Sequence, residues 1–163
     1  LSDERLRARL SEVGTLGEHE PLARHTTIRL GGPARWFLSA ADPEKLVALL
    51  AWLEGERVPW TVLGGGSNVV APDEGFPGVV IRPVSATLHI APDGGVVADA
   101  GVATALLARR TVAAGLAGLA WAAGLPGAVG GAVVGNAGCY GGEIRDGLAW
   151  VEAWSPQARA VRR

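Results

Sequence analysis

The most constraining feature of this sequence is a long segment without charge. From Thr111 to Gly142 there is no Asp, Glu, Lys or Arg, and the segment is rich in alanine and glycine. It is longer than the roughly 20 residues that a membrane-spanning helix needs. However, Pro126 and the glycines around it would break such a helix near its middle. We therefore expect a buried, glycine-rich binding segment inside a folded domain, and no membrane span.

Composition excludes several other classes of protein. Apolar residues make up 48% of the 163 residues and the net charge is −1, which argues against disorder and against a nucleic-acid-binding surface. The single cysteine, Cys139, excludes an intramolecular disulfide framework, and the three histidines show no metal-ligand spacing. We expect no metal site. The 24 glycines indicate that backbone shape carries the function.

Periodicity and turn signals predict a mixed architecture. The helices expected from capping residues and apolar spacing cover 2–13, 42–55 and 103–114. The expected strands cover 27–30, 36–38, 58–63, 69–70, 79–82, 87–90, 96–98 and 148–154. A boundary near Pro83 separates a βαβ-like first part from a second part that is rich in antiparallel pairing.

Two glycine-rich loops are the candidate binding elements. The first, Gly64–Asn68, directly follows an apolar strand that ends at Leu63. Such a loop can direct several backbone N–H groups at one anion, although on its own it is equally consistent with a tight turn. The second loop, Leu125–Gly142, contains Asn136 and Tyr140. Two loops of this kind suit a long ligand with a pyrophosphate in its middle.

The common nucleotide-binding and nucleophile motifs are absent. Val69 stands where a GxGxxG fingerprint needs glycine, and the only lysine, Lys45, lies in a predicted helix instead of a Walker A loop. Asn68 and Val69 after Ser67 exclude a GxSxG nucleophile elbow. These motifs therefore do not identify the ligand.

Four segments together resemble a known family. The segments are Thr27–Ala34, Leu63–Asn68, Gly124–Ala132 and Asn136–Ile144. In order and spacing they are similar to UDP-N-acetylenolpyruvoylglucosamine reductases over about residues 20–155, except that Cys139 stands where the family commonly has alanine. Each motif also occurs in other flavoproteins of the same fold, but the set of four is specific.

The resemblance implies an α+β FAD-binding fold of two α+β subdomains, 1–83 and an incomplete 84–163, with the family's third, substrate-binding domain absent from this chain. It implies bound FAD, with NADPH as the co-substrate that reduces an enolpyruvyl UDP-sugar to UDP-N-acetylmuramate for peptidoglycan synthesis. The implied cofactor-binding residues are Leu63, Gly64, Gly65, Gly66, Ser67, Asn68, Leu125, Pro126, Gly127, Gly130, Gly131, Asn136, Ala137 and Gly138. Tyr140 is implied to contact the substrate. We expect a cytoplasmic monomer with no nucleic-acid or membrane partner.

The catalytic residues of the family find no counterpart in this sequence. Its catalytic arginine, serine proton donor and glutamate lie in segments beyond Arg163, so we expect the 163-residue chain alone to be inactive. Two alternatives stay open. One is another FAD-linked oxidoreductase of the same fold, and the other is a flavin-binding module without catalysis.

Overall fold

The computed structural model describes residues 1–163, which form two compact units. Unit 1 consists of Leu1–Leu63, Asn68–Pro83 and Trp150–Arg163, and unit 2 consists of Gly64–Ser67 and Val84–Ala149. The chain therefore passes between the units at four places.

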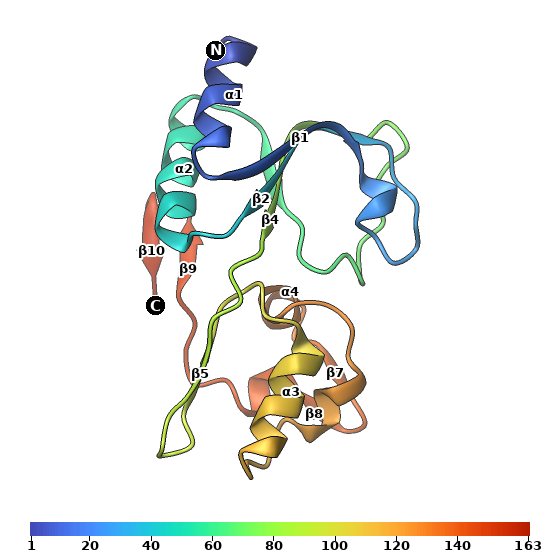
Figure 1. Ribbon diagram of the computed structural model, residues 1–163, viewed down its shortest axis with the longest axis vertical. Helices are drawn as coiled ribbons and strands as arrows, with labels where there is room; N and C mark the ends of the chain where they lie inside the picture. Colours follow the sequence, from blue (N-terminus) through green and yellow to red (C-terminus); the bar gives the residue numbers. More distant parts are fainter. The chain divides into compact units, whose positions relative to one another are not determined.

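Unit 1 contains a four-stranded sheet (Figure 1). Its strands are β1 (Gly14–Pro21), β2 (Pro33–Ala40), β3 (Trp60–Val62) and β4 (Phe76–Pro83), in the order β1-β2-β4-β3. β1 is antiparallel to β2, whereas β2 and β3 are both parallel to β4. The predicted βαβ-like arrangement is present, with one helix between β2 and β3.

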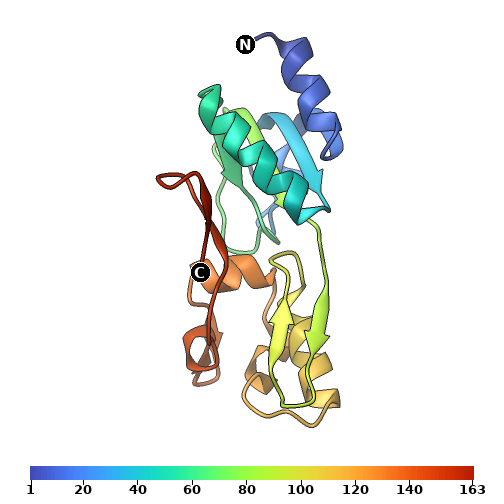
Figure 2. The same cartoon turned by 90° about the vertical axis from the view of Figure 1, so that its left-hand side faces the viewer.

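Two helices cover one face of this sheet (Figures 1 and 2). They are α1 (Asp3–Ser11) and α2 (Pro43–Gly55). Ser2 caps α1 by accepting a hydrogen bond from the Arg5 N–H, and the Asp42 carboxylate caps α2. The predicted helices 2–13 and 42–55 are confirmed. A 3-10 turn, η1 (Leu22–Arg24), follows β1.

Strand alternation divides the core of unit 1 into two clusters. The helix-facing cluster contains Leu6, Leu10, Val13, Trp36, Leu38, Ala40, Leu49, Leu50, Leu53, Val79 and Ile81. The cluster on the opposite face contains Leu22, Ala34, Phe37, Leu63, Ala71 and Val80. Neighbouring residues of β2 and β4 enter different clusters because successive strand side chains point to opposite faces.

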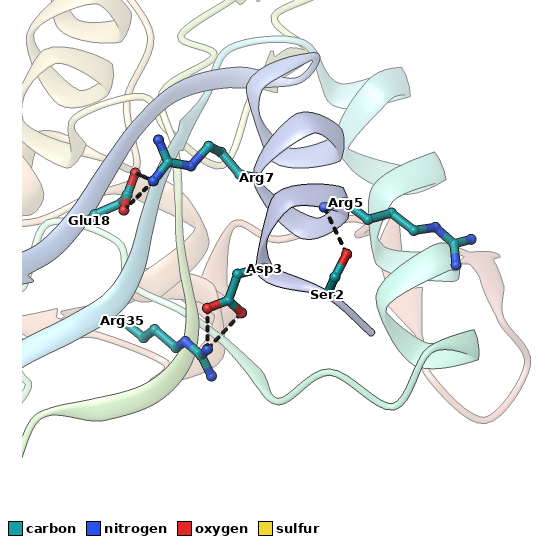
Figure 3. A network of polar contacts seen from close by, with 6 residues as sticks. All are labelled: Ser2, Asp3, Arg5, Arg7, Glu18 and Arg35. Atoms are coloured by element: carbon teal, nitrogen blue, oxygen red, sulfur yellow. Dashed lines mark hydrogen bonds and ion pairs between the residues drawn. The ribbon is translucent and has the colours of Figure 1, made fainter.

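Ion pairs fasten α1 to the strands (Figure 3). An Arg35 nitrogen contacts both Asp3 carboxylate oxygens at 2.6 and 2.7 Å, and Arg7 pairs with Glu18 at 2.6 Å. All four side chains are substantially exposed, so each pair contributes at most about 1 kcal/mol to folding stability. This contribution comes in addition to that from the burial of Leu6 and Leu10.

Unit 2 is built from small elements. Its antiparallel ribbons are β5 (Leu88–Ile90) with β6 (Val96–Ala98), and β7 (Gly138–Cys139) with β8 (Gly142–Glu143). Its helices are α3 (Thr104–Ala113) and the short α4 (Val129–Val134). Two 3-10 turns, η2 (Ala120–Gly124) and η3 (Ile144–Asp146), complete it. The predicted helix 103–114 is confirmed.

Several predicted strands are wrong. Residues 27–30 form a turn, because the Thr26 hydroxyl donates to the Leu30 carbonyl and Arg29 has a φ of +58°. Val69 and Val70 pair with no strand, and the strand predicted over 148–154 is only β9 (Ala153–Ser155), paired with β10 (Ala160–Arg162). β1 was not predicted, since its glycines and glutamates lack apolar alternation.

The two units also differ from the predicted segments 1–83 and 84–163. Pro83 ends one stretch of unit 1, but Trp150–Arg163 lie in unit 1 and Gly64–Ser67 in unit 2. Trp154 accounts for the first difference, because it packs against the helix-facing cluster. Among all the helices of the chain, none has the length and apolar character that a bilayer crossing requires.

Candidate functional site

The first glycine loop, Gly64–Asn68, presents backbone donors that the protein does not use. The N–H of Leu63, just before it, donates to the Ile81 carbonyl at 2.9 Å. None of the next five N–H groups finds an acceptor within the protein. Gly66 has a φ of +66°, a left-handed conformation that turns successive N–H groups toward one side. The loop therefore offers a row of free donors, which suits an anion.

The structure brings part of the second glycine loop, Leu125–Gly131, against the first. The Ser67 hydroxyl donates to the Pro126 carbonyl at 3.3 Å. A Cβ on Gly65 would lie 2.6 Å from Gly127 Cα, so the two backbones approach more closely than any side chain would allow. Both contacts lie within unit 2. We call Gly64–Ser67 and Leu125–Gly131, which all lie in unit 2, together the glycine cradle.

The glycines of the second loop have different roles. The N–H groups of Val129 and Gly130 donate to the carbonyls of Val102 and Ala100 at 2.8 and 2.9 Å. A Cβ on Gly130 would meet Ala100 Cβ at 2.8 Å, so Gly130 is needed for packing. A Cβ on Gly131 would meet no protein atom within 4 Å. Of these residues, Gly131 is the one that faces open space.

The β7–β8 hairpin and the residues next to it bind or include the predicted residues Asn136, Ala137 and Gly138. The Asn136 side chain donates to the Glu143 carboxylate at 2.7 Å and accepts from the Arg145 N–H at 3.0 Å. The Ala137 N–H donates to the Ala132 carbonyl, and Gly138 belongs to β7. These contacts tie the hairpin to the end of α4. Binding of a cofactor by these three residues stays a prediction.

Tyr140 lies at the tip of that hairpin. Its side chain is 93% exposed and its φ is +51°, a conformation in which a tyrosine is rare. Together with Gly141 it forms the two-residue turn between β7 and β8. The structure therefore holds an aromatic ring out into solvent.

Sequence reasoning missed Thr104, the first residue of α3. It is fully buried, and its hydroxyl oxygen lies 2.6 Å from the Leu125 carbonyl oxygen and 3.2 Å from that of Gly127. The helical spacing of Thr104, Leu107, Ala108 and Thr111 places all four on the buried face of α3. A polar residue at a buried position of this pattern is the signal that could have found it.

The pKa of Asp99 departs from its ordinary value. Burial would raise the pKa of Asp99, but hydrogen bonds from the Ser85 hydroxyl and the Thr87 N–H outweigh burial and lower it. Asp99 therefore stays ionised at the base of the β5–β6 ribbon, next to Ala100.

No cluster of three or more His, Cys, Asp or Glu side chains that could hold a metal ion is present.

Comparisons with known proteins agree with this geometry. A family model described as "FAD binding domain" matches residues 34–162. UDP-N-acetylenolpyruvoylglucosamine reductase of Chloroflexus aurantiacus is 45% identical over 137 residues, which are 82% of this chain and 46% of that protein. The enzyme of the same name from Geobacter sulfurreducens is 46% identical over 147 residues, covering 88% of this chain and 49% of that protein.

A solved structure shows the same fold. The crystal structure of UDP-N-acetylenolpyruvylglucosamine reductase from Thermus caldophilus matches with a TM-score of 0.74 and 35% identity, over 91% of this chain and 50% of that one. The chain thus spans about half the length of the relatives that it matches. These findings confirm the resemblance inferred from the four segments and the α+β FAD-binding fold. Because the family model matches most of its residues, this chain belongs to the FAD binding domain family.

Proposed function

We propose that the glycine cradle holds the pyrophosphate of FAD. The observation that carries this proposal is the row of four free N–H groups from Gly64 to Ser67. A pyrophosphate has the charge and the acceptor oxygens to use such a row, since hydrogen bonds to an ionised acceptor are the strong ones. The close approach of Gly65 to Gly127 gives the row its shape.

The open space next to Gly131 also fits bound FAD. Because a Cβ on Gly131 would enter open space, a ligand can approach the backbone there without displacing protein. The exposed side chains of Val134 and Tyr140, both at least 90% accessible, belong to the same unit. They offer apolar and aromatic surface to a ring system or to a substrate, and this supports the predicted contact of Tyr140 with the UDP-sugar.

We propose further that the chain is the cofactor-binding part of an enzyme that uses NADPH to reduce an enolpyruvyl UDP-sugar during peptidoglycan synthesis. This proposal rests on the names of the relatives and on the shared fold. When bound, FAD supplies hydride transfer between NADPH and the enolpyruvyl group. The residues of this chain contribute binding and orientation: backbone donors hold the anionic centre of the cofactor, and the packed glycines fix where it lies.

No residue of this chain is assigned a proton-donating role. The reaction also needs an acid and donors that stabilise the developing negative charge. We therefore predict that residues 1–163 bind FAD without reducing the UDP-sugar. The cytoplasmic location and the monomeric state also stay predictions.

The experiment is a titration of the purified chain with FAD, in which the quenching of flavin fluorescence measures binding. We expect saturable binding with one FAD per chain. Gly65→Val should abolish binding, and Gly147→Ala, at a glycine with no atom near its Cβ position, should leave it unchanged. If Gly65→Val bound FAD as tightly as the wild type, the assignment of the cradle would be wrong. Turnover of the enolpyruvyl substrate by the 163-residue chain with NADPH would contradict the proposed absence of a proton donor.

A further inference from the structure

Three consecutive carbonyls of the second glycine loop are hydrogen-bonded to two hydroxyl-bearing residues. Thr104 Oγ1 contacts the Leu125 carbonyl at 2.6 Å and that of Gly127 at 3.2 Å, and the Thr104 N–H donates to Gly127 at 3.1 Å. The Ser67 hydroxyl donates to Pro126, the carbonyl between them, at 3.3 Å. These carbonyls are therefore satisfied by unit 2 itself, and their peptide orientations are fixed.

Thr104 makes most of these bonds from a fully buried position. Water cannot replace its hydroxyl. The hydroxyl has a single proton, and the shorter contact makes the Leu125 carbonyl its main acceptor, so this carbonyl would lose its donor if the hydroxyl were removed, whereas the Gly127 carbonyl would keep the bond from the Thr104 N–H. The hydroxyl does not cap its own helix, because Ala103 is the N-cap and Thr104 is already the first helical residue. Its partners lie 21 and 23 residues further along the chain. The bond is therefore a tertiary contact between α3 and the glycine cradle.

Thr111 provides a comparison within the same helix. It is 1% exposed, against 0% for Thr104, but its hydroxyl donates to the Ala108 carbonyl of its own helix. The two threonines thus share residue type, helix and burial, and differ in whether the hydroxyl reaches the cradle.

The position of Gly127 connects Thr104 to the first glycine loop. Gly127 has a φ of +109°, and its backbone is the surface against which Gly65 lies. If the Leu125–Gly127 peptides rotated, Gly127 would move relative to Gly65 and the row of free N–H groups would change shape. Thr104 holds the peptides on both sides of Pro126 against that rotation.

We propose that Thr104 is a positioning residue for the glycine cradle, acting on FAD affinity through the Leu125 and Gly127 carbonyls without touching the cofactor. The inference rests on the proposed function, because the affinity in question is that for FAD.

The test compares Thr104→Val, Thr104→Ser and Thr111→Val in the full chain. Three quantities are measured for each variant. They are the FAD dissociation constant, obtained from flavin fluorescence quenching, the visible circular dichroism of the bound flavin at saturation, and the thermal midpoint without FAD. We expect Thr104→Val to weaken FAD binding about tenfold or more and to alter the flavin dichroism. Thr104→Ser, which keeps the hydroxyl, should bind within about twofold of the wild type. Thr111→Val should lower the thermal midpoint without changing either flavin signal.

The outcomes separate this inference from the proposed function. A wild-type chain that does not bind FAD overturns the proposed function and the inference with it. Wild-type binding together with an unchanged dissociation constant in Thr104→Val overturns the inference alone. If Thr104→Val does not fold, Thr104→Ser decides: binding like the wild type supports the role of the hydroxyl, and binding weakened beyond about twofold overturns it.

Discussion

The two units of this chain are stabilised in different ways. Both buried hydrophobic clusters lie in unit 1, where leucines of α1 and α2 pack on β2 and β4. The buried residues of unit 2 are mostly small: Val102, Thr104, Leu107, Ala108, Thr111, Ala122, Ala132 and Ile144. Backbone hydrogen bonds and close glycine contacts take the place of a large apolar core there. Unit 1 is therefore specified by side chains and unit 2 largely by its backbone.

This difference has a thermodynamic consequence. Apolar burial is the main favourable contribution to folding, and unit 2 buries little of it. Unit 2 also contains glycines, which lose the most conformational entropy on folding. A ligand that binds the folded cradle adds stability in proportion to its concentration and affinity. We expect FAD to stabilise unit 2 more than unit 1.

The largest expected effect is a core truncation in unit 1. Leu53→Ala removes a fully buried side chain of α2 and should destabilise the chain by about 2–5 kcal/mol. Urea unfolding measured by circular dichroism checks this value. Val112→Ala, at a half-exposed site of α3, is the control and should cost well under 1 kcal/mol. Equal effects at the two sites would contradict the distinction between the units.

The second largest effect is expected when the backbone contact between Gly65 and Gly127 in unit 2 is broken. Gly65→Ala places a Cβ 2.6 Å from Gly127 Cα, and neither backbone can yield without moving its loop. We expect FAD binding to weaken by at least about tenfold, whereas unit 1 should unfold at an unchanged urea concentration. Fluorescence titration measures the first quantity. Gly55→Ala, at the open end of α2, serves as the matched control in unit 1.

A smaller effect is expected at Gly131, where the glycine cradle faces open space. Gly131→Ala introduces no clash with protein, and alanine favours a helix over glycine by up to about 1 kcal/mol. The variant should therefore be as stable as the wild type or slightly more stable, yet bind FAD several-fold more weakly, because the added methyl occupies ligand space. Gly135→Ala, at the other end of α4, should leave affinity unchanged. An unaltered FAD affinity in Gly131→Ala would remove Gly131 from the site.

The smallest effect concerns pH. Because the pKa of Asp99 is lowered in the folded chain, its ionised form stabilises unit 2 at pH values above the ordinary aspartate pKa of about 3.9. This contribution is lost as pH falls through the lower folded value. Asp99→Asn should flatten the decrease in unit 2 stability in that acid range. Hydrogen exchange of β5 and β6 at several pH values measures it, and identical pH profiles would contradict the assignment.

The sequence predicted the two helices of unit 1 well. Capping by Ser2 and Asp42 and the leucine spacing of α2 located two helices correctly, because these signals are local. β1 was missed, because its pairing with β2 is decided by tertiary structure and not by alternation. The strand predicted at 27–30 failed for the opposite reason, since the Thr26 hydroxyl stabilises a turn there.

The candidate site was predictable as two loops but not as one arrangement. Glycine content marked Gly64–Asn68 and the segment around Pro126. Sequence could not show that Gly65 lies against Gly127, or that Gly130 serves packing whereas Gly131 faces open space. Thr104 was missed because a threonine at a buried helix position carries no motif, and its partners lie 21 and 23 residues further along the chain. Contacts between distant backbones leave little trace in one sequence.

The most direct test of the account is hydrogen–deuterium exchange of the chain with and without FAD, read by mass spectrometry. The N–H groups of Gly64–Asn68 have no acceptor in the protein and should exchange rapidly without FAD. With FAD bound, we predict strong protection of this loop and of the peptide containing Gly131, whereas peptides of α2 and β4 should change little. Saturating FAD that leaves the exchange of Gly64–Asn68 unaltered would contradict the claim that these backbone donors bind the cofactor.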